Sequence, residues 1–180
     1  MKPPEGKYFN CRSLKKTYVR NYKCGSQSVL EMMPNWVQSI NPEFERFSIV
    51  RHPVERAKSI YKEMVKRKLH REKTFLTWLK LLFEEGFYHN HQFTQTELLT
   101  DSYPIRLFTI DQMDDVISWV GVQKNKIPHT NQNKQKLECG IMHNSLIASI
   151  YHDDFALYEH VERCQKKDGI IVKNPINKFV

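Results

Sequence analysis

The chain has 180 residues, of which 40% are hydrophobic and 12% are aromatic. These values are typical of a globular protein and exclude wholesale disorder. Because a chain of this length can bury one core of usual size but not two, we expect a single domain over 1–180 with its core at about 17–166. The formal net charge of +8 predicts attraction to polyanions such as nucleic acid, an anionic membrane, an acidic polysaccharide or a nucleotide with several phosphates.

In chain order, the hydrophobic patterns predict alternating strands and helices. Strands are expected at 17–22, 46–50 and 105–110, and helices at 26–33, 53–68, 74–85, 112–120 and 143–166. The polar, aperiodic stretch 121–140 is expected to be a loop. This order indicates an α/β fold with a central parallel sheet and helices on both faces, in which ligands bind beyond the carboxyl ends of the strands.

The first predicted strand leads into the turn Lys23-Cys-Gly-Ser-Gln-Ser28. Gly25 lets the backbone approach a ligand closely, Ser26 and Ser28 supply hydroxyls, and the following helix offers free N–H groups. Lys23 adds a point charge. Because this lysine precedes the only glycine of the turn, the pattern differs from the P-loop motif, which disfavours an ATPase or a kinase.

The second predicted strand ends at Arg51. Pro53 then suits the first turn of a helix, where its fixed φ fits and its missing N–H costs nothing. Ser59 lies nearly opposite the expected apolar face of this helix, formed by Ala57, Ile60, Tyr61, Met64 and Val65. An arginine at a strand end beside a helical hydroxyl suits an anionic group, although the same pattern also describes an ordinary buried strand and an exposed serine. Since Lys23 and Arg51 both follow predicted strands, we expect them to share one edge of the sheet.

Together, Lys-x-Gly-Ser-x-Ser at 23–28 and Arg-x-Pro-x-Glu-Arg-x-x-Ser-x-Tyr at 51–61 resemble the two cofactor motifs of sulfotransferases. These enzymes transfer a sulfuryl group from 3′-phosphoadenosine 5′-phosphosulfate (PAPS). The closest resemblance is to the carbohydrate sulfotransferases of the chondroitin 4-O type, sulfotransferase family 2, over roughly 17–160. Three later segments keep that family's order: 91–95 (with Thr94 in place of its proline and the aromatic residue shifted to Phe93), 105–114 and 150–158.

The resemblance implies a P-loop-like, PAPS-binding sulfotransferase fold whose reaction leaves 3′-phosphoadenosine 5′-phosphate (PAP). Its first motif implies a loop that holds the 5′-phosphosulfate, formed by Lys23, Cys24, Gly25, Ser26, Gln27 and Ser28. Its second motif implies that Arg51 and Ser59 hold the 3′-phosphate. No metal is expected, and the spacing of the four cysteines does not support a zinc site.

Two residues are expected to act in catalysis. Lys23 is placed to stabilise the charge that grows on the phosphate side as the sulfuryl group leaves. An imidazole is the usual base near neutral pH, and His91 lies in the segment that matches the family's His-x-x-x-Gln pattern. His89 and Glu31 are the alternative bases. His52 is expected to shape a helix start, and three histidines are expected on helix surfaces, namely His143, His152 and His160.

The expected partner is a hydroxyl acceptor, an oligosaccharide or polysaccharide by the family resemblance, and the positive charge suits an acidic glycan. No stretch approaches 18 apolar residues, and the first residues contain no hydrophobic signal region. The expectation is therefore a chain without a membrane anchor in the cytoplasm, with its cysteines as thiols, or in the Golgi lumen if the chain is an excised domain.

Two other functions stay open. A basic nucleic-acid-binding module would fit the charge, but the chain lacks zinc-finger spacing and an aromatic–glycine RNA-binding signature, and its basic residues are dispersed. The chain could also be a catalytically inactive, nucleotide-binding relative of the sulfotransferases. The segment between Ser28 and Arg51 is shorter than in most relatives, which implies a trimmed acceptor pocket.

Overall fold

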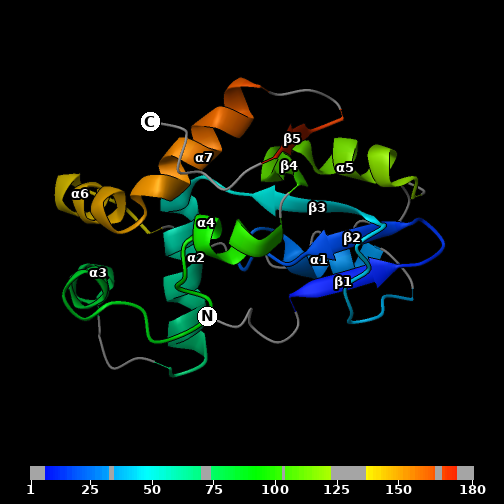
Figure 1. Ribbon diagram of the computed structural model, residues 1–180. Coiled ribbons are helices and arrows are strands. Elements are labelled where there is room, and N and C mark those ends of the chain that lie inside the picture. The colour runs from blue at the N-terminus through cyan, green and yellow to red at the C-terminus, as the bar shows by residue number, and fades with distance from the viewer. Residues whose placement is uncertain are drawn as a thin grey trace.

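The computed structural model describes residues 7–32, 35–69, 74–102, 104–122, 137–164 and 168–173. It is an α/β fold built on a five-stranded mixed sheet with the strand order β1-β2-β3-β4-β5 (Figure 1). The strands are β1 (Tyr8–Cys11), β2 (Lys16–Val19), β3 (Glu45–Val50), β4 (Ile105–Thr109) and β5 (Ile170–Val172).

The α-helices are α1 (Ser26–Met32), α2 (Pro53–Lys66), α3 (Phe75–Glu85), α4 (Gln95–Leu99), α5 (Met113–Val120), α6 (Ile141–Ile150) and α7 (His152–Arg163). Short 3₁₀ turns, η1 (Thr100–Ser102) and η2 (Ile110–Gln112), precede β4 and α5. Within the described ranges, no helix has the length and apolar character needed to cross a bilayer.

The sheet is not purely parallel, which corrects the prediction. Its three central strands, β2, β3 and β4, are parallel, but both edge strands pair antiparallel with their neighbours. Antiparallel strands can be joined by a tight turn, whereas parallel strands need a long crossover. The turn from β1 to β2 is of this kind and contains Lys15 at a φ of +50°. β1 and β5 have only four and three residues, too few for a clear alternating pattern in the sequence.

Helices cover both faces of the sheet, as predicted. Neighbouring side chains of a strand point to opposite faces, so Tyr18 packs in a cluster with α1 and α5, whereas Val19 packs in a second cluster with α4 and α7. The hydrophobic core extends beyond the predicted 17–166, because Cys11 in β1 and Val172 in β5 are buried.

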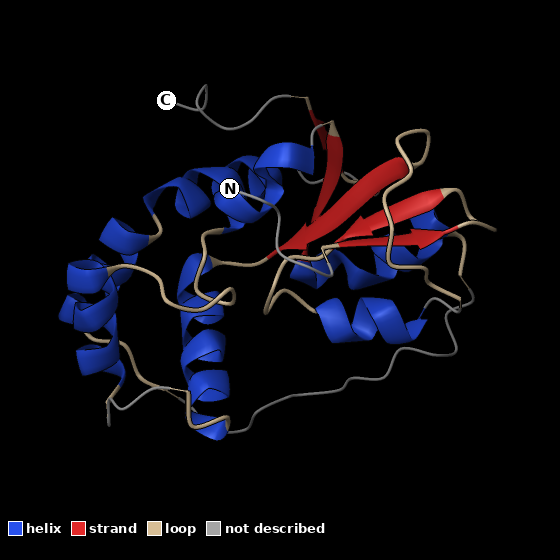
Figure 2. Cartoon of the chain, turned by 60° about the horizontal axis from the view of Figure 1, so that its bottom comes forward, coloured by secondary structure: helices blue, strands red, loops and turns tan. Residues whose placement is uncertain are grey.

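A third hydrophobic cluster joins α2, α3 and α6. These helices lie beside the sheet (Figure 2). The apolar face predicted for α2 supplies buried side chains to this cluster, except that Val65 is 47% exposed near the end of the helix. Trp78 of α3 is the largest fully buried side chain and packs against Tyr61 and Phe75.

The last predicted helix, 143–166, is wrong as one continuous element, and its residues 165–166 lie outside the described ranges. The chain forms α6 and α7, which meet at Tyr151. The Tyr151 side chain is buried, stacks on Phe87 and donates its hydroxyl hydrogen to the Gln92 carbonyl at 3.2 Å. These long-range contacts fix the bend, and helix periodicity does not contain them. Of the loop predicted at 121–140, residues 123–136 also lie outside the described ranges.

Gly169 occupies a position before β5 that a side chain cannot share. Its φ is +68°, and a Cβ would lie 2.8 Å from both the Leu107 carbonyl oxygen and the Phe108 ring. We expect Gly169→Ala to lower the free energy of unfolding by about 2–5 kcal/mol, of which about 1–2 comes from the left-handed backbone and about 1–3 from overpacking. Urea denaturation measures this loss. Gly121→Ala is the control, because its φ is +85° but nothing lies within 4 Å of the new Cβ. Equal losses in the two variants would contradict the clash.

Candidate functional site at the carboxyl edge of the parallel strands

The two sequence motifs meet at one edge of the sheet. Lys23 lies in the loop after β2, and Arg51 follows β3 directly. The guanidinium Nη1 of Arg51 donates a hydrogen bond to the Lys23 carbonyl oxygen at 3.2 Å. The structure therefore places both residues at the carboxyl ends of neighbouring parallel strands, where α/β sheets bind their ligands.

The loop after β2 has an unusual backbone. Lys23 has a φ of +64° and Gly25 a φ of +78°. For a lysine, the left-handed region costs roughly 1–2 kcal/mol, and such strain persists where the surroundings hold it in place. Gly25 has little room for a side chain, since a Cβ would lie 3.1 Å from the Met113 Cε.

The Lys23 side chain lies against α2. Its Nζ is 3.4 Å from Glu63 Oε2, and Glu63 also pairs with Arg67 one turn further along the helix. Burial lowers the pKa of Lys23, and the Glu63 carboxylate opposes that shift. Burial alone would raise the pKa of Glu63, but Arg67 and Lys23 outweigh it, so this pKa lies below its usual value. Glu63 was not among the predicted site residues, although it follows Ser59 by four residues and so shares that flank of the helix.

His91 lies in the segment before α4, with its ring centroid 4.6 Å from that of Tyr22 and 4.7 Å from that of His89. Its Nδ1 is buried without a hydrogen-bond partner among the described residues. Burial, followed by the His89, Lys23 and Arg67 charges, lowers the pKa of His91 to about 4. The imidazole is therefore neutral at neutral pH. The Lys23 charge is close enough to disfavour the protonated form of His91.

Several side chains of the first motif are occupied within the protein. The Cys24 thiol is fully buried and donates to Gln95 Oε1 at 3.2 Å, and burial raises its pKa to about 11. The Ser26 hydroxyl donates to the Asn21 carbonyl at 2.6 Å and accepts from the Tyr18 hydroxyl at 3.1 Å. These contacts build the turn, and the backbone N–H of Cys24 is also bonded within the protein, to the Asn21 carbonyl oxygen at 3.4 Å.

The remaining predicted residues are more open. Gln27 is exposed and donates to Glu31, which is also exposed on α1. Ser28 on α1 and Ser59 on α2 are half-buried. The structure thus brings Lys23 together with Arg51 and with the charges that surround His91. It leaves Glu31, the alternative base, on the surface of α1.

A buried ionic network, which was not predicted, lies behind this edge. Arg56 is 1% exposed and donates to the carbonyls of Tyr22 and Phe93 at 3.1 and 2.6 Å. Its Nη1 lies 3.6 Å from a carboxylate oxygen of Asp154 on α7. Burial raises the pKa of Asp154, and Arg56 and the backbone N–H groups of Gln95 and Thr96 oppose the shift. Arg56 belongs to the second motif and Asp154 to the segment 150–158, so the only signal in the sequence was their place in those motifs.

The other histidines have local roles. The prediction for His52 is confirmed, because its Nδ1 accepts from the Val54 N–H at the start of α2, at 3.3 Å. His152 is exposed at the start of α7. His143 is half-buried, stacks on Phe75 and accepts from the Gly140 N–H, so it does more than cover a helix surface.

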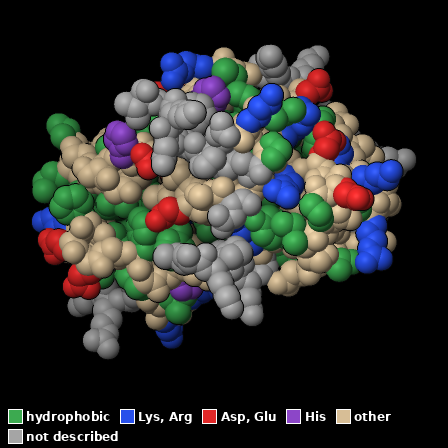
Figure 3. Space-filling model, in the orientation of Figure 1, with side chains coloured by type: hydrophobic (Ala, Val, Ile, Leu, Met, Phe, Trp, Pro, Cys, Tyr) green, Lys and Arg blue, Asp and Glu red, His purple; other side chains and the backbone are tan. Residues whose placement is uncertain are grey.

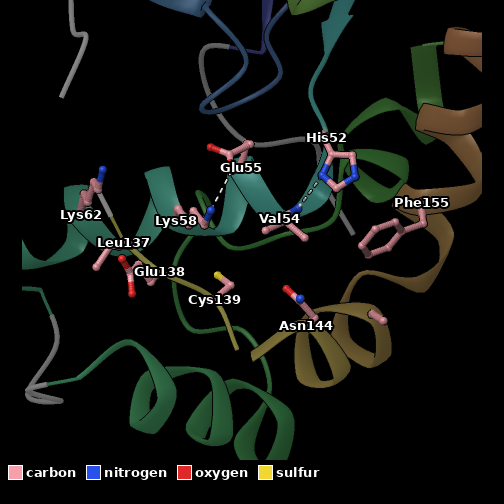
Figure 4. A pocket seen from close by; sticks show the side chains of 11 residues that line it. His52, Val54, Glu55, Lys58, Lys62, Leu137, Glu138, Cys139, Asn144 and Phe155 are labelled. Atoms are coloured by element: carbon pink, nitrogen blue, oxygen red, sulfur yellow. Dashed lines mark hydrogen bonds and ion pairs between the residues drawn. The ribbon is translucent and has the colours of Figure 1, made fainter. Parts of the chain in front are cut away.

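A separate groove of about 1070 Å³ follows another flank of α2 (Figure 4). It runs between α2 and the start of α6 and is lined by His52, Val54, Glu55, Lys58, Lys62, Leu137, Glu138, Cys139, Asn144, Ala148 and Phe155. Lys58 is paired with Glu55 at 2.8 Å. The groove contains neither Lys23 nor His91, so the residues predicted from the motifs lie outside it.

The charges visible on one face are mixed. Figure 3 shows Lys and Arg side chains interspersed with Asp and Glu over its right-hand part. Among the described residues, no group of three or more His, Cys, Asp or Glu side chains is arranged to hold a metal ion. The candidate site consists of the cationic edge formed by Lys23 and Arg51 and the cluster of Glu63, Arg67 and His91 beside it.

Comparison with known proteins gives no relative: no family profile, curated protein or solved structure matches this chain.

Proposed function

We propose that this chain is a PAPS-dependent sulfotransferase that transfers a sulfuryl group to a hydroxyl acceptor, of the carbohydrate class by the family resemblance. The observation that carries the proposal is the hydrogen bond from Arg51 Nη1 to the Lys23 carbonyl, which joins the two motifs at one edge of the parallel strands. A P-loop-like sulfotransferase fold is part of the same proposal.

The geometry supports the binding of a different anionic group of the nucleotide by each of the two motifs. Arg51 offers a planar fork of donors that suits the 3′-phosphate, with the half-buried Ser59 hydroxyl on the adjoining helix. Lys23 and the left-handed turn at Gly25 suit the 5′-phosphosulfate, because a cation attracts anions and the backbone N–H groups of such a turn can form an anion-binding concavity. A nucleotide with an anionic group at each end would span the two.

In the proposed reaction, the bond between sulfur and the bridging phosphate oxygen breaks as a bond from sulfur to the acceptor oxygen forms. Lys23 stabilises the charge that develops on the bridging oxygen. His91, neutral because of its low pKa, takes the proton of the acceptor hydroxyl. Glu63 orients the Lys23 ammonium from 3.4 Å.

Nucleotide binding tests the proposal. We expect PAP to raise the melting temperature more than adenosine 5′-phosphosulfate, which lacks the 3′-phosphate, and more than ATP or duplex DNA. In Arg51→Ala, PAP affinity should fall about 10- to 150-fold, because a hydrogen bond to a charged group contributes about 1.5–3 kcal/mol. The preference for PAP over adenosine 5′-phosphosulfate should disappear in the same variant. Differential scanning fluorimetry and calorimetric titration measure both effects.

Lys62→Ala is the control for this experiment, because Lys62 lines the separate groove on α2. It should leave PAP affinity unchanged. A loss of affinity in Lys62→Ala but not in Arg51→Ala would move the nucleotide to the groove. Stabilisation by duplex DNA alone would favour a nucleic-acid-binding module, and PAP binding without turnover on a panel of acceptors would favour an inactive nucleotide binder.

A further inference from the structure

Gln95 is fully buried where the two motifs meet. Its Oε1 accepts from the Arg51 backbone N–H at 2.9 Å, from Asn21 Nδ2 at 3.1 Å and from the Cys24 thiol at 3.2 Å. Its Nε2 donates to the Arg51 carbonyl at 2.9 Å. One side-chain amide thus contacts the loop after β2 and the corner after β3.

The two bonds to Arg51 explain why an amide is needed. The paired register of β3 with β4 ends at Val50, so the N–H and C=O of Arg51 lie beyond the sheet. Both bonds are part-buried, and backbone groups withdrawn from water need partners; an amide supplies both an acceptor and a donor. Gln95 therefore takes the place of a neighbouring strand for this one residue. A methionine can satisfy neither group, and an ionised glutamate only the N–H.

Gln95 is itself held in place from behind. Its backbone N–H donates to Asp154 Oδ2 at 2.9 Å, and Asp154 faces the buried Arg56. Thr94 and Glu97 form a capping box around the start of α4, the short helix that Gln95 begins. The amide therefore has a fixed position relative to both motifs.

We propose that Gln95 is a positioning residue that sets the spacing between the 5′-phosphosulfate loop and the 3′-phosphate corner. The inference rests on the proposed function, and it deepens that function by assigning the relative placement of its two anion subsites to one buried side chain. Gln95 acts through Arg51 and Asn21, because its amide atoms are already occupied by the protein.

Gln92 provides a matched control for Gln95. It is a second fully buried glutamine in the same segment, and its Oε1 accepts from the backbone N–H groups of Tyr88 and His89. Gln92→Met and Gln95→Met therefore remove the same amide from similar burial, but only the second removes contacts to the two motifs. Both variants are expected to lose stability.

The first measurement needs no ligand. In Gln95→Met, hydrogen exchange of the Arg51 amide should accelerate about tenfold relative to Gln92→Met. A tenfold change corresponds to about 1.4 kcal/mol, within the roughly 1–3 kcal/mol that leaving a shielded donor without its acceptor costs. Gln95→Glu keeps an acceptor for this amide, so its exchange should be intermediate and the variant serves if Gln95→Met does not fold. Equal exchange of the Arg51 amide in wild type, Gln95→Met and Gln95→Glu would overturn the inference.

The second measurement tests the link to the ligand. The ratio of PAP affinity to adenosine 5′-phosphosulfate affinity should fall about tenfold in Gln95→Met and should be unchanged in Gln92→Met, since only the spacing of the two subsites changes. An unchanged ratio in Gln95→Met would overturn the positioning role. If wild type shows no preference for PAP, the proposed function fails, while the exchange of the Arg51 amide still decides whether Gln95 clamps the two motifs.

Discussion

Lys23→Ala should lower turnover at saturating PAPS about 10²–10³-fold, the loss typical of removing one donor to developing charge. The affinity for PAP should fall much less. The reason is that Lys23 is proposed to act on charge that grows on the bridging oxygen only as the sulfuryl group leaves, so its contribution is larger in the transition state than in the bound complex. Steady-state turnover and calorimetric titration of PAP measure the two quantities separately.

Lys15→Ala is a matched control for this substitution. Lys15 is also a lysine with a positive φ, +50° against +64° for Lys23, but it lies exposed in the turn between β1 and β2. Any general effect of removing a lysine from a left-handed position appears in both variants. Normal turnover in Lys23→Ala at saturating PAPS would remove Lys23 from the mechanism, and an equal loss in Lys15→Ala would assign the effect to stability.

Local patterns predicted the elements that position the site. Pro53 begins α2 as its fixed φ predicts, and Lys23 and Arg51 lie beside each other because parallel strands carry their carboxyl ends to the same edge. These predictions needed only strand direction and helix-start chemistry. The edge strands escaped prediction because β1 and β5 are too short to show a period.

The network that holds the site could not be predicted in the same way. Gln95 contacts Asn21 across 74 residues of sequence, and Asp154 contacts the Gln95 backbone across 59. A polar residue inside an apolar pattern gives no sign of a partner so distant, and its burial is favourable only because that partner exists. Glu63 was not predicted for another reason. A glutamate between lysines and arginines on a helix flank is typical of an ordinary solvent-exposed charge.

His91→Ala should lower turnover by about 10²-fold or more, within the range of about 10²–10⁴ that a positioned base contributes, while PAP still binds. Retained PAP binding shows that the variant is folded. His89→Ala and Glu31→Gln are the comparisons, since His89 is the neighbouring imidazole and Glu31 the alternative carboxylate. If either of them loses turnover and His91→Ala does not, the base has been assigned to the wrong residue.

The pH dependence of activity adds a further test. The sequence alone predicts that activity falls at an ordinary imidazole pKa as the pH is lowered, whereas the structure places this fall at a lower pH. The environment of His91 lowers its pKa from 6.5 to about 4. The neutral form accepts the proton, so wild-type activity should persist as the pH falls below 6.5 and decline only near pH 4. Between these values the unfolded chain binds more protons at this residue than the folded protein does, so His91 also makes stability fall as the pH falls through the same window. Three measurements separate the loss of catalysis from the loss of stability. Initial rates report activity at each pH, circular dichroism at the same pH values reports folding, and an NMR titration of the His91 ring reports its protonation. An acid limb near 6.5 that persists in His91→Ala would place the titrating base elsewhere.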